Sequence, residues 1–244
     1  VNKKINDGLA AYAQYAKGFL IPDLNTFYVA NSGKNTTDPQ KTTNYQLGVV
    51  GQSDKFTWDM DLYRIDFTNK ATTISVNGVA DHIENIGGVR YEGFEAQMTY
   101  VLGGGFAAYA NGAINKTRIN DTGKETTGAP NMTAALGALY SAGPLSSSLI
   151  MKRVGAIRNQ LFNAANPANF DYYQTKSYDN LDLGVAYTMK NIGSFGKALK
   201  LQLNVFNLLN SQQVTAIAPG KTVALDGYTY QAPRSMQVTA KLDF

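Results

Sequence analysis

The sequence has 244 residues, with 22 Lys and Arg against 18 Asp and Glu, one His and no Cys. The missing Cys excludes a disulfide scaffold, a thiolate zinc site, an iron–sulfur cluster and a cysteine nucleophile. No run of about 18 apolar residues is present, which excludes a transmembrane helix, and a net charge of +4 without a local basic cluster does not support nucleic-acid binding.

Apolar and polar residues alternate along much of the chain with a period of two, which places them on opposite faces of a β-strand. In chain order, the clearest apolar phases begin at Phe56, Phe94, Leu181, Leu199 and Met236. No segment has apolar residues at helical spacing over three turns. We therefore predict an all-β chain of about ten strands. They lie near residues 8–19, 43–52, 56–76, 82–102, 105–119, 131–142, 145–158, 178–190, 197–217 and 229–244.

The connections between these strands alternate between two sizes. Short, turn-like connections lie at 53–55, 103–105, 142–144 and 193–196, and longer polar ones lie at 21–42, 120–130, 159–177 and 218–228, with a shorter member near 77–78. Short turns at one end and long loops at the other are typical of outer-membrane barrels. Several strands also exceed the five or six residues usual in globular sheets and reach the roughly 9–11 that cross a bilayer.

The two faces of these strands also fit a barrel. The polar phase carries small and charged residues, and the apolar phase carries Leu, Val, Met and aromatics. In a membrane barrel the first lines a wet lumen and the second meets lipid. Because unpaired backbone groups cost several kcal/mol in hydrocarbon, such a sheet must close on itself. We predict an antiparallel transmembrane β-barrel in the bacterial outer membrane.

Five short motifs occur in an order and spacing that resemble a known family. They are Tyr12-Ala13-Gln14-Tyr15-Ala16-Lys17-Gly18-Phe19 with Pro22, Asn44-Tyr45-Gln46-Leu47-Gly48, Glu84-Asn85-Ile86-Gly87 followed by Gly93-Phe94-Glu95, Asn207-Leu208-Leu209-Asn210, and Pro233-Arg234 before the last strand. With them, the chain resembles the C-terminal part of the barrel of a TonB-dependent outer-membrane receptor.

The resemblance implies a barrel of about 22 strands with an N-terminal plug in its lumen. Residues 1–244 would then be about the last ten strands, and the plug, the TonB-contacting segment and about a dozen strands would lie outside this sequence. The chain starts at Val1 without a Met or a signal segment, which fits a mature protein or a fragment. Since ten open strands would expose two long edges, we expect a piece of a longer receptor.

The resemblance also implies roles for three residues. Glu95 lies on the polar phase and corresponds to a glutamate that pairs with arginines of the plug, and Gln46 stands where the family has a second such glutamate. An arginine–carboxylate contact is charge-assisted and directional, so Gln46 keeps a hydrogen-bonding group but loses a charge. Phe244 resembles the terminal aromatic by which the barrel-assembly machinery recognises its clients, and could equally be an interfacial anchor.

Ligand contacts in this family come from extracellular loops and the upper lumen wall. The candidates here are Tyr28, His82, Arg118, Arg158, Tyr172 and Tyr173. Aromatic and Arg side chains suit anionic chelates through stacking and charge-assisted bonds. One His without Cys is a poor transition-metal site, and neighbouring Asp81 and Glu84 lack calcium-loop spacing. We expect no metal site, no cofactor and no catalytic residue.

The function that the resemblance implies is TonB-energised import of a scarce ligand, most often a ferric-siderophore. The expected partners are outer-membrane lipid, the plug and remaining strands, TonB, the barrel-assembly machinery and a ferric chelate, without nucleic acid. Haem, cobalamin, a metal or an oligosaccharide are equally compatible with tyrosine-rich loops. Two alternatives from other classes stay open, namely a ten-stranded outer-membrane barrel enzyme such as a protease, and a soluble β-sandwich that binds carbohydrate.

Overall fold

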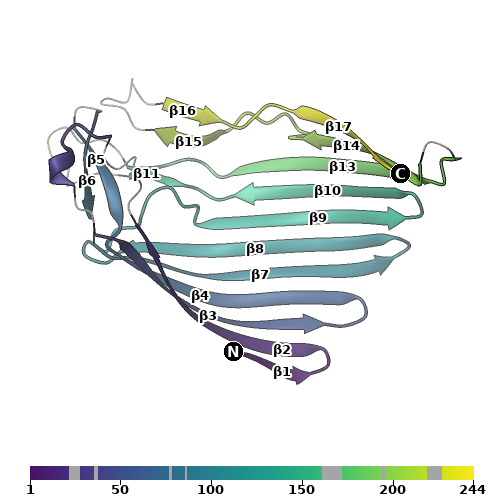
Figure 1. Cartoon of the computed structure of the whole chain (residues 1–244), viewed down its shortest axis with the longest axis horizontal. Coiled ribbons are helices and arrows are strands. Elements are labelled where there is room, and N and C mark those ends of the chain that lie inside the picture. Colours follow the sequence, from purple (N-terminus) through teal and green to yellow (C-terminus); the bar gives the residue numbers. More distant parts are fainter. Residues whose placement is uncertain are drawn as a thin grey trace.

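The computed structural model describes residues 1–21, 28–35, 38–76, 79–85, 87–160, 172–193, 196–218 and 227–244. Eleven strands form one sheet in the order β1-β2-β3-β4-β7-β8-β9-β10-β13-β14-β17. Every neighbouring pair in this order is antiparallel, as Figure 1 shows. The predicted all-β, antiparallel fold is confirmed.

The strands differ in length between the sheet and the hairpins that stand outside it. The sheet strands are β1 (Asn2–Asn6), β2 (Leu9–Leu20), β3 (Gln40–Gln52), β4 (Phe56–Thr68), β7 (Val89–Gly103), β8 (Phe106–Ile119), β9 (Met132–Ala142), β10 (Leu145–Val154), β13 (Tyr178–Lys190), β14 (Ala198–Phe206) and β17 (Ser235–Asp243). Three hairpins are inserted between sheet strands, formed by β5 (Ala71–Val76) with β6 (Val79–Asn85), β11 (Arg158–Gln160) with β12 (Tyr172–Gln174), and β15 (Val214–Ala218) with β16 (Gly227–Tyr230). A short 3-10 turn, η2 (Ser32–Lys34), lies between β2 and β3.

The sheet contains one strand, β1, that was not predicted from the sequence. β1 joins β2 through the pairs Asn2↔Tyr12 and Lys4↔Ala10, which makes eleven sheet strands instead of about ten. Its sequence, Asn-Lys-Lys-Ile-Asn, contains a single apolar residue. Apolar and polar residues alternate only in a strand that has one face toward an apolar medium. A strand such as β1, which joins the sheet mainly through backbone hydrogen bonds, therefore cannot be recognised by alternation.

Four predicted strands, 56–76, 82–102, 197–217 and 229–244, are too long, because each combines a strand of the sheet with a strand of an inserted hairpin. Asn69 and Asn207 follow directly after β4 and β14 and adopt positive φ angles of 56° and 51°. This left-handed conformation cannot continue a strand, and Asn tolerates it better than most residues. The alternating residues beyond these two points instead form the separate hairpins β5–β6 and β15–β16.

The connections gather by size at the two ends of the sheet, as predicted. The short turns lie at one end and the three hairpins at the other (Figure 1). In the turn between β7 and β8, Gly103, Gly104 and Gly105 have φ angles of 99°, 61° and 88°. Three successive positive φ angles are readily available only to glycine, so this tripeptide sets the turn locally.

The described residues hold almost no apolar core. Their buried hydrophobic residues are Val89, Ala135, Ala186 and Val205. Large apolar side chains are instead exposed, with Leu47 at 62%, Leu62 at 60% and Ile114 at 62% of their full area. The strand register places these three on one face of the sheet. This distribution excludes the β-sandwich alternative, because a sandwich buries its apolar face between two sheets.

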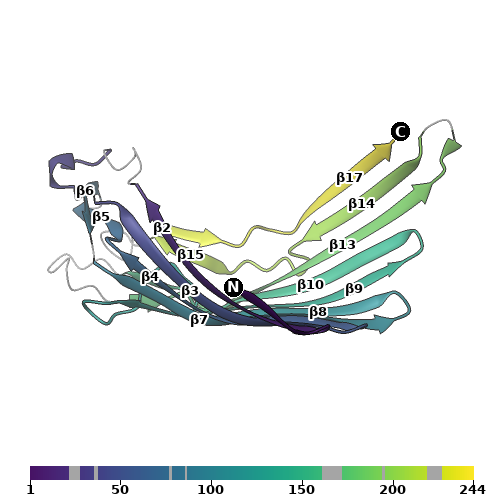
Figure 2. The ribbon, with the colours of Figure 1, turned by 60° about the horizontal axis from the view of Figure 1, so that its bottom comes forward.

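The sheet curves into an open trough (Figure 2). β1 and β17 stand at the two ends of the strand order and do not pair with each other, so the barrel is not closed by this chain. Side chains converge on the concave side of a curved sheet and spread apart on the convex side, so the phase of Asp61, which is 8% exposed, is the concave one, and the phase of Leu62, which is 60% exposed, is the convex one. Among the residues described, no helix is long and apolar enough to cross a membrane.

Candidate functional site

The strand register brings polar side chains from three strands to the middle of the concave face. Tyr12 on β2 pairs with Gly48 on β3, Gly48 with Asp61 on β4, and Asp61 with Glu95 on β7. Residues that face each other directly across antiparallel strands project from the same side of the sheet. Tyr12, Asp61 and Glu95 therefore form one row across the concave face.

Glycine makes room for the tyrosine in this row. A Cβ atom on Gly48 would overlap the ring of Tyr12, which lies across the glycine and reaches the next strand. There the Tyr12 hydroxyl donates a hydrogen bond of 3.3 Å to Oδ2 of Asp61. The next row repeats this arrangement, because Gly93 leaves space for Tyr63, whose hydroxyl donates to Oδ1 of Asn115 at 3.1 Å. The two Gly–Tyr pairs stabilise the concave face where backbone would otherwise be bare.

Asp61 is the most unusual residue of the concave face. It is only 8% exposed, and its Oδ1 atom is buried without a hydrogen-bond partner among the described residues. The Glu95 carboxylate lies directly opposite on β7, and Asp59 lies two residues along β4, opposite Gln97. Like charges that face each other across strands destabilise a sheet. We call Asp59, Asp61 and Glu95 the acidic cluster, and within the described ranges no Lys, Arg or His forms an ion pair with it.

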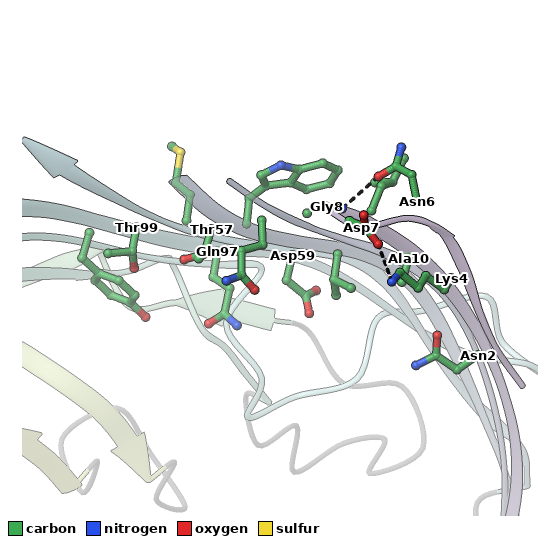
Figure 3. A pocket seen from close by; sticks show the side chains of 17 residues that line it. Asn2, Lys4, Asn6, Asp7, Gly8, Ala10, Thr57, Asp59, Gln97 and Thr99 are labelled. Carbon is green, nitrogen blue, oxygen red and sulfur yellow. Dashed lines mark hydrogen bonds and ion pairs between the residues drawn. The ribbon is translucent and has the colours of Figure 1, made fainter. Parts of the chain in front are cut away.

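A hollow lies beside the acidic cluster, toward the short turns. It measures about 620 Å³, and its lining includes Asn2, Lys4, Asp59, Gln97 and Tyr109. Figure 3 shows Asp59 and Gln97 projecting to the same side of the sheet, while the Lys4 ammonium is engaged by Asp7 at 2.6 Å. The Lys4 ammonium is therefore paired with Asp7 and not with the acidic cluster.

The residues predicted to face the plug both lie on the concave side. Gln46 is half-buried on β3 and shares its row with Gln14 and Tyr63, one row from Glu95. Asp61 is missing from the predicted site, although it lies on the polar phase of its strand. The sequence does not show that β4 pairs with β7 across the inserted β5–β6 hairpin, and this pairing is what places Asp61 opposite Glu95.

The residues predicted to contact ligand are scattered at the loop end. Tyr28 is 84% exposed, and Arg158 pairs with Glu125 at 2.6 Å beside a cavity of about 90 Å³. Arg118 lies on the convex phase, opposite Arg90, and so does not face the lumen. Tyr172 and Tyr173 lie on β12, and their side chains fall outside the described residues.

His82 belongs to a contact between two loop segments. The residues before η2 run along β6, with backbone hydrogen bonds from Ala30 to Ala80 and from Asn31 to Asp81. The Asp81 carboxylate accepts hydrogen bonds from His82 and Asn31, and these bonds lower its pKa below the ordinary value of 3.8. Within the described part of the chain, no group of three His, Asp or Glu side chains is placed to hold a metal ion.

Comparison with known proteins identifies the family. The family model described as TonB dependent receptor-like, beta-barrel, matches residues 3–208. The chain belongs to this family. It is therefore part of an outer-membrane barrel. The family is of the receptor and transporter type, which argues against the alternative of a barrel enzyme. No curated protein sequence matches the chain significantly.

Solved structures of TonB-dependent receptors share the fold. The ferripyoverdine receptor of the Pseudomonas aeruginosa outer membrane, bound to ferripyoverdine, aligns with all of this chain over 32% of its own length, at 20% identity and a TM-score of 0.71. The copper transporter OprC aligns over 38% of its length, with 18% identity and a TM-score of 0.78. The ferric yersiniabactin uptake receptor of Yersinia pestis gives 15% identity and 0.68 over 36% of its length. The chain thus spans about a third of the solved receptors that it matches.

Proposed function

We propose that residues 1–244 are the C-terminal part of the barrel of a TonB-dependent receptor that imports a ferric-siderophore with energy supplied through TonB. The observation that carries this proposal is the open trough, apolar outside and polar inside, with an uncompensated acidic cluster at its centre. Several structural neighbours are receptors named for ferric chelates, including ferripyoverdine and ferric yersiniabactin. Their likeness supports the substrate class proposed for this chain.

The acidic cluster is the proposed contact for the plug. Gln46 and Glu95 line the concave face, and the buried Oδ1 of Asp61 lies beside them without a hydrogen-bond partner in the described part of the chain. A guanidinium group can satisfy two carboxylates at once through its fork of donors. We infer that one or more arginines of the plug dock at Asp61 and Glu95. Asp61 then supplies the second negative charge that Gln46 does not carry.

The proposed ligand contacts are at the opposite end from the short turns. Tyr28, His82 and Arg158 lie in or beside the loop segments there, and Tyr172 and Tyr173 belong to the β11–β12 hairpin at the same end. Phenol, imidazole and guanidinium groups bind anionic iron chelates by stacking and charge-assisted bonds. Phe244 is 82% exposed at the end of β17, where the barrel-assembly machinery would recognise it.

An uptake assay with the full-length receptor tests the function. A strain lacking its other iron receptors should accumulate radioactive iron from the matching ferric-siderophore only when both this receptor and TonB are present. Copper uptake, measured in parallel, addresses the substrate class suggested by the copper transporter OprC. TonB-dependent copper uptake without iron uptake would mean that the substrate is a metal ion and not a ferric chelate. Uptake without TonB would contradict the proposed energy source.

A further inference from the structure

The convex face changes abruptly from apolar to charged toward the loop end. The register defines three successive rows across this face. The first is apolar and runs through Leu47, Leu62, Phe94, Ile114 and Met132. The second contains Tyr45, Arg64, Glu92 and Lys116, and the third contains Lys17, Thr43, Asp66, Arg90 and Arg118. Arg and Lys on the lipid face cost about 2–4 kcal/mol at the bilayer midplane but only about 0–1 kcal/mol near the interfaces, so the second and third rows mark the membrane interface at the loop end.

The charged rows carry more cations than anions. Lys17, Arg64, Arg90, Lys116 and Arg118 face only two anions, Asp66 and Glu92. We call these seven residues the rim cluster. A basic patch is invisible in the sequence because each strand contributes only one or two of its charges. Pairing of β2, β3, β4, β7 and β8 brings them together.

The internal ion pairs leave part of the rim cluster unneutralised. Asp66 accepts from both Arg64 and Arg90, with Nε–O distances of 2.8 Å in each case. Arg118 lies directly opposite Arg90 on the neighbouring strand and is exposed. Among the described residues neither Arg118 nor Lys116 forms an ion pair within 4.0 Å. Two cations facing each other across strands repel, and an anion held between them removes that repulsion.

We propose that the rim cluster binds the phosphate groups of a glycolipid in the outer leaflet of the membrane. Arg118 and Lys116 would make the principal contacts, and Arg64, Arg90 and Lys17 would extend the positive surface. The occupant follows from position and charge. The cluster borders the lipid-facing apolar rows at the loop end, and the long loops of outer-membrane barrels are extracellular, so the headgroups at this level belong to the outer leaflet. Phosphate groups of a glycolipid there, such as those of lipid A, would complement the excess positive charge of the rim cluster. Basic residues near a membrane surface attract anionic headgroups, and Arg binds phosphate bidentately.

Lipid binding to the full-length receptor tests the proposal. Delipidated receptor in detergent is titrated with bisphosphorylated lipid A, and bound copies are counted by native mass spectrometry. The K116Q/R118Q variant removes both principal charge-assisted contacts and should bind at least about tenfold more weakly. The K116R/R118K variant keeps both charges and should bind within about threefold of wild type. K55Q removes a cation from a short turn at the far end and should change nothing.

Further arms of the titration separate the lipid from other anions. Dephosphorylated lipid should bind wild type about as weakly as lipid A binds the K116Q/R118Q variant. Inorganic phosphate should not compete at millimolar concentration, because a lipid anchored by its acyl chains also contacts the apolar rows. Equal binding of phosphorylated and dephosphorylated lipid, unchanged binding by K116Q/R118Q, or full competition by inorganic phosphate would each overturn the proposal. Unaltered heat-modifiable migration on a gel shows that each variant is folded.

Discussion

The chemistry of the concave face depends on one buried carboxylate. Asp61 has a single protein partner, the Tyr12 hydroxyl, and its remaining oxygen is enclosed without one among the described residues. Burying a charge without a partner is costly, and Glu95 opposite adds repulsion. Both costs disappear if a cation from another part of the receptor occupies the site. For this reason we propose that Asp61 faces a cation of the plug.

The plug contact predicts that removing the Asp61 charge weakens plug docking. In the full-length receptor, D61N should lower the free energy of plug unfolding by about 1.5–3 kcal/mol, the usual size of a hydrogen bond to a charged group. Urea-induced exposure of a fluorophore attached to the plug measures it. Q46E should have the opposite sign, because it adds a carboxylate one row from Glu95. If D61N instead stabilises the plug, relief of repulsion dominates and no cation docks at Asp61.

The loop contact at Asp81 predicts a response to acid. Its hydrogen bonds to His82 and Asn31 lower the pKa of the carboxyl group in the folded state. A group with a lowered pKa stabilises the fold above its ordinary pKa, here 3.8, and loses that contribution as the pH falls through the lower folded value. Hydrogen exchange of the Asn31 amide, which donates to the Asp81 carbonyl, should therefore increase relative to neighbouring strands below about pH 4.

D81N supplies the control for this acid response. It removes the titrating group but keeps an oxygen that can accept a hydrogen bond from Asn31. Protection of the Asn31 amide should then be lower at neutral pH and independent of pH between about 3 and 6. A pH response that persists in D81N would assign the effect to another group.

At the level of elements, alternation predicts strands well because the convex face meets lipid. Leu181, Leu183 and Val185 on β13 alternate with Asp182 and Gly184 on the concave side, and this contrast is visible in the sequence. The sequence does not show which strands pair, because β4 pairs with β7 although the β5–β6 hairpin lies between them in the chain.

The end of β14 depends on Asn207, which predicts a large effect of its substitution. Its side chain donates to the carbonyl oxygens of Ser211 at 2.8 Å and Ala232 at 2.7 Å and accepts from the Ser211 amide at 3.0 Å. N207A loses these bonds and places alanine at a φ of 51°, so the free energy of unfolding should fall by about 3 kcal/mol or more.

N207G separates the two causes of that loss. Glycine adopts a positive φ without strain but makes none of the side-chain hydrogen bonds. It should recover about 1 kcal/mol relative to N207A. Urea-induced unfolding of the full-length receptor in detergent, followed by tryptophan fluorescence, measures both variants. Equal stability of wild type and N207A would show that the hydrogen bonds to Ser211 and Ala232 do not hold the end of β14.

At the scale of the molecule, the sheet has two unpaired edges. The outer side of β1 and the outer side of β17 each carry backbone groups that the other described strands do not satisfy. In lipid each such group costs several kcal/mol, which is why we propose that further strands of the receptor lie between them. The solved relatives fit this proposal, since the chain aligns with only 32–38% of their length.

Expression of residues 1–244 alone tests the need for those strands. Refolded into detergent, the isolated chain should show β-structure by circular dichroism but no heat-modifiable, monomeric band, because its edges pair between molecules. Co-refolding with the upstream strands of the same receptor should restore a compact band that runs faster without heating. A monomeric, heat-modifiable species from residues 1–244 by themselves would mean that β1 and β17 can pair. The eleven strands would then form a small barrel of their own, too narrow to hold a plug in its lumen.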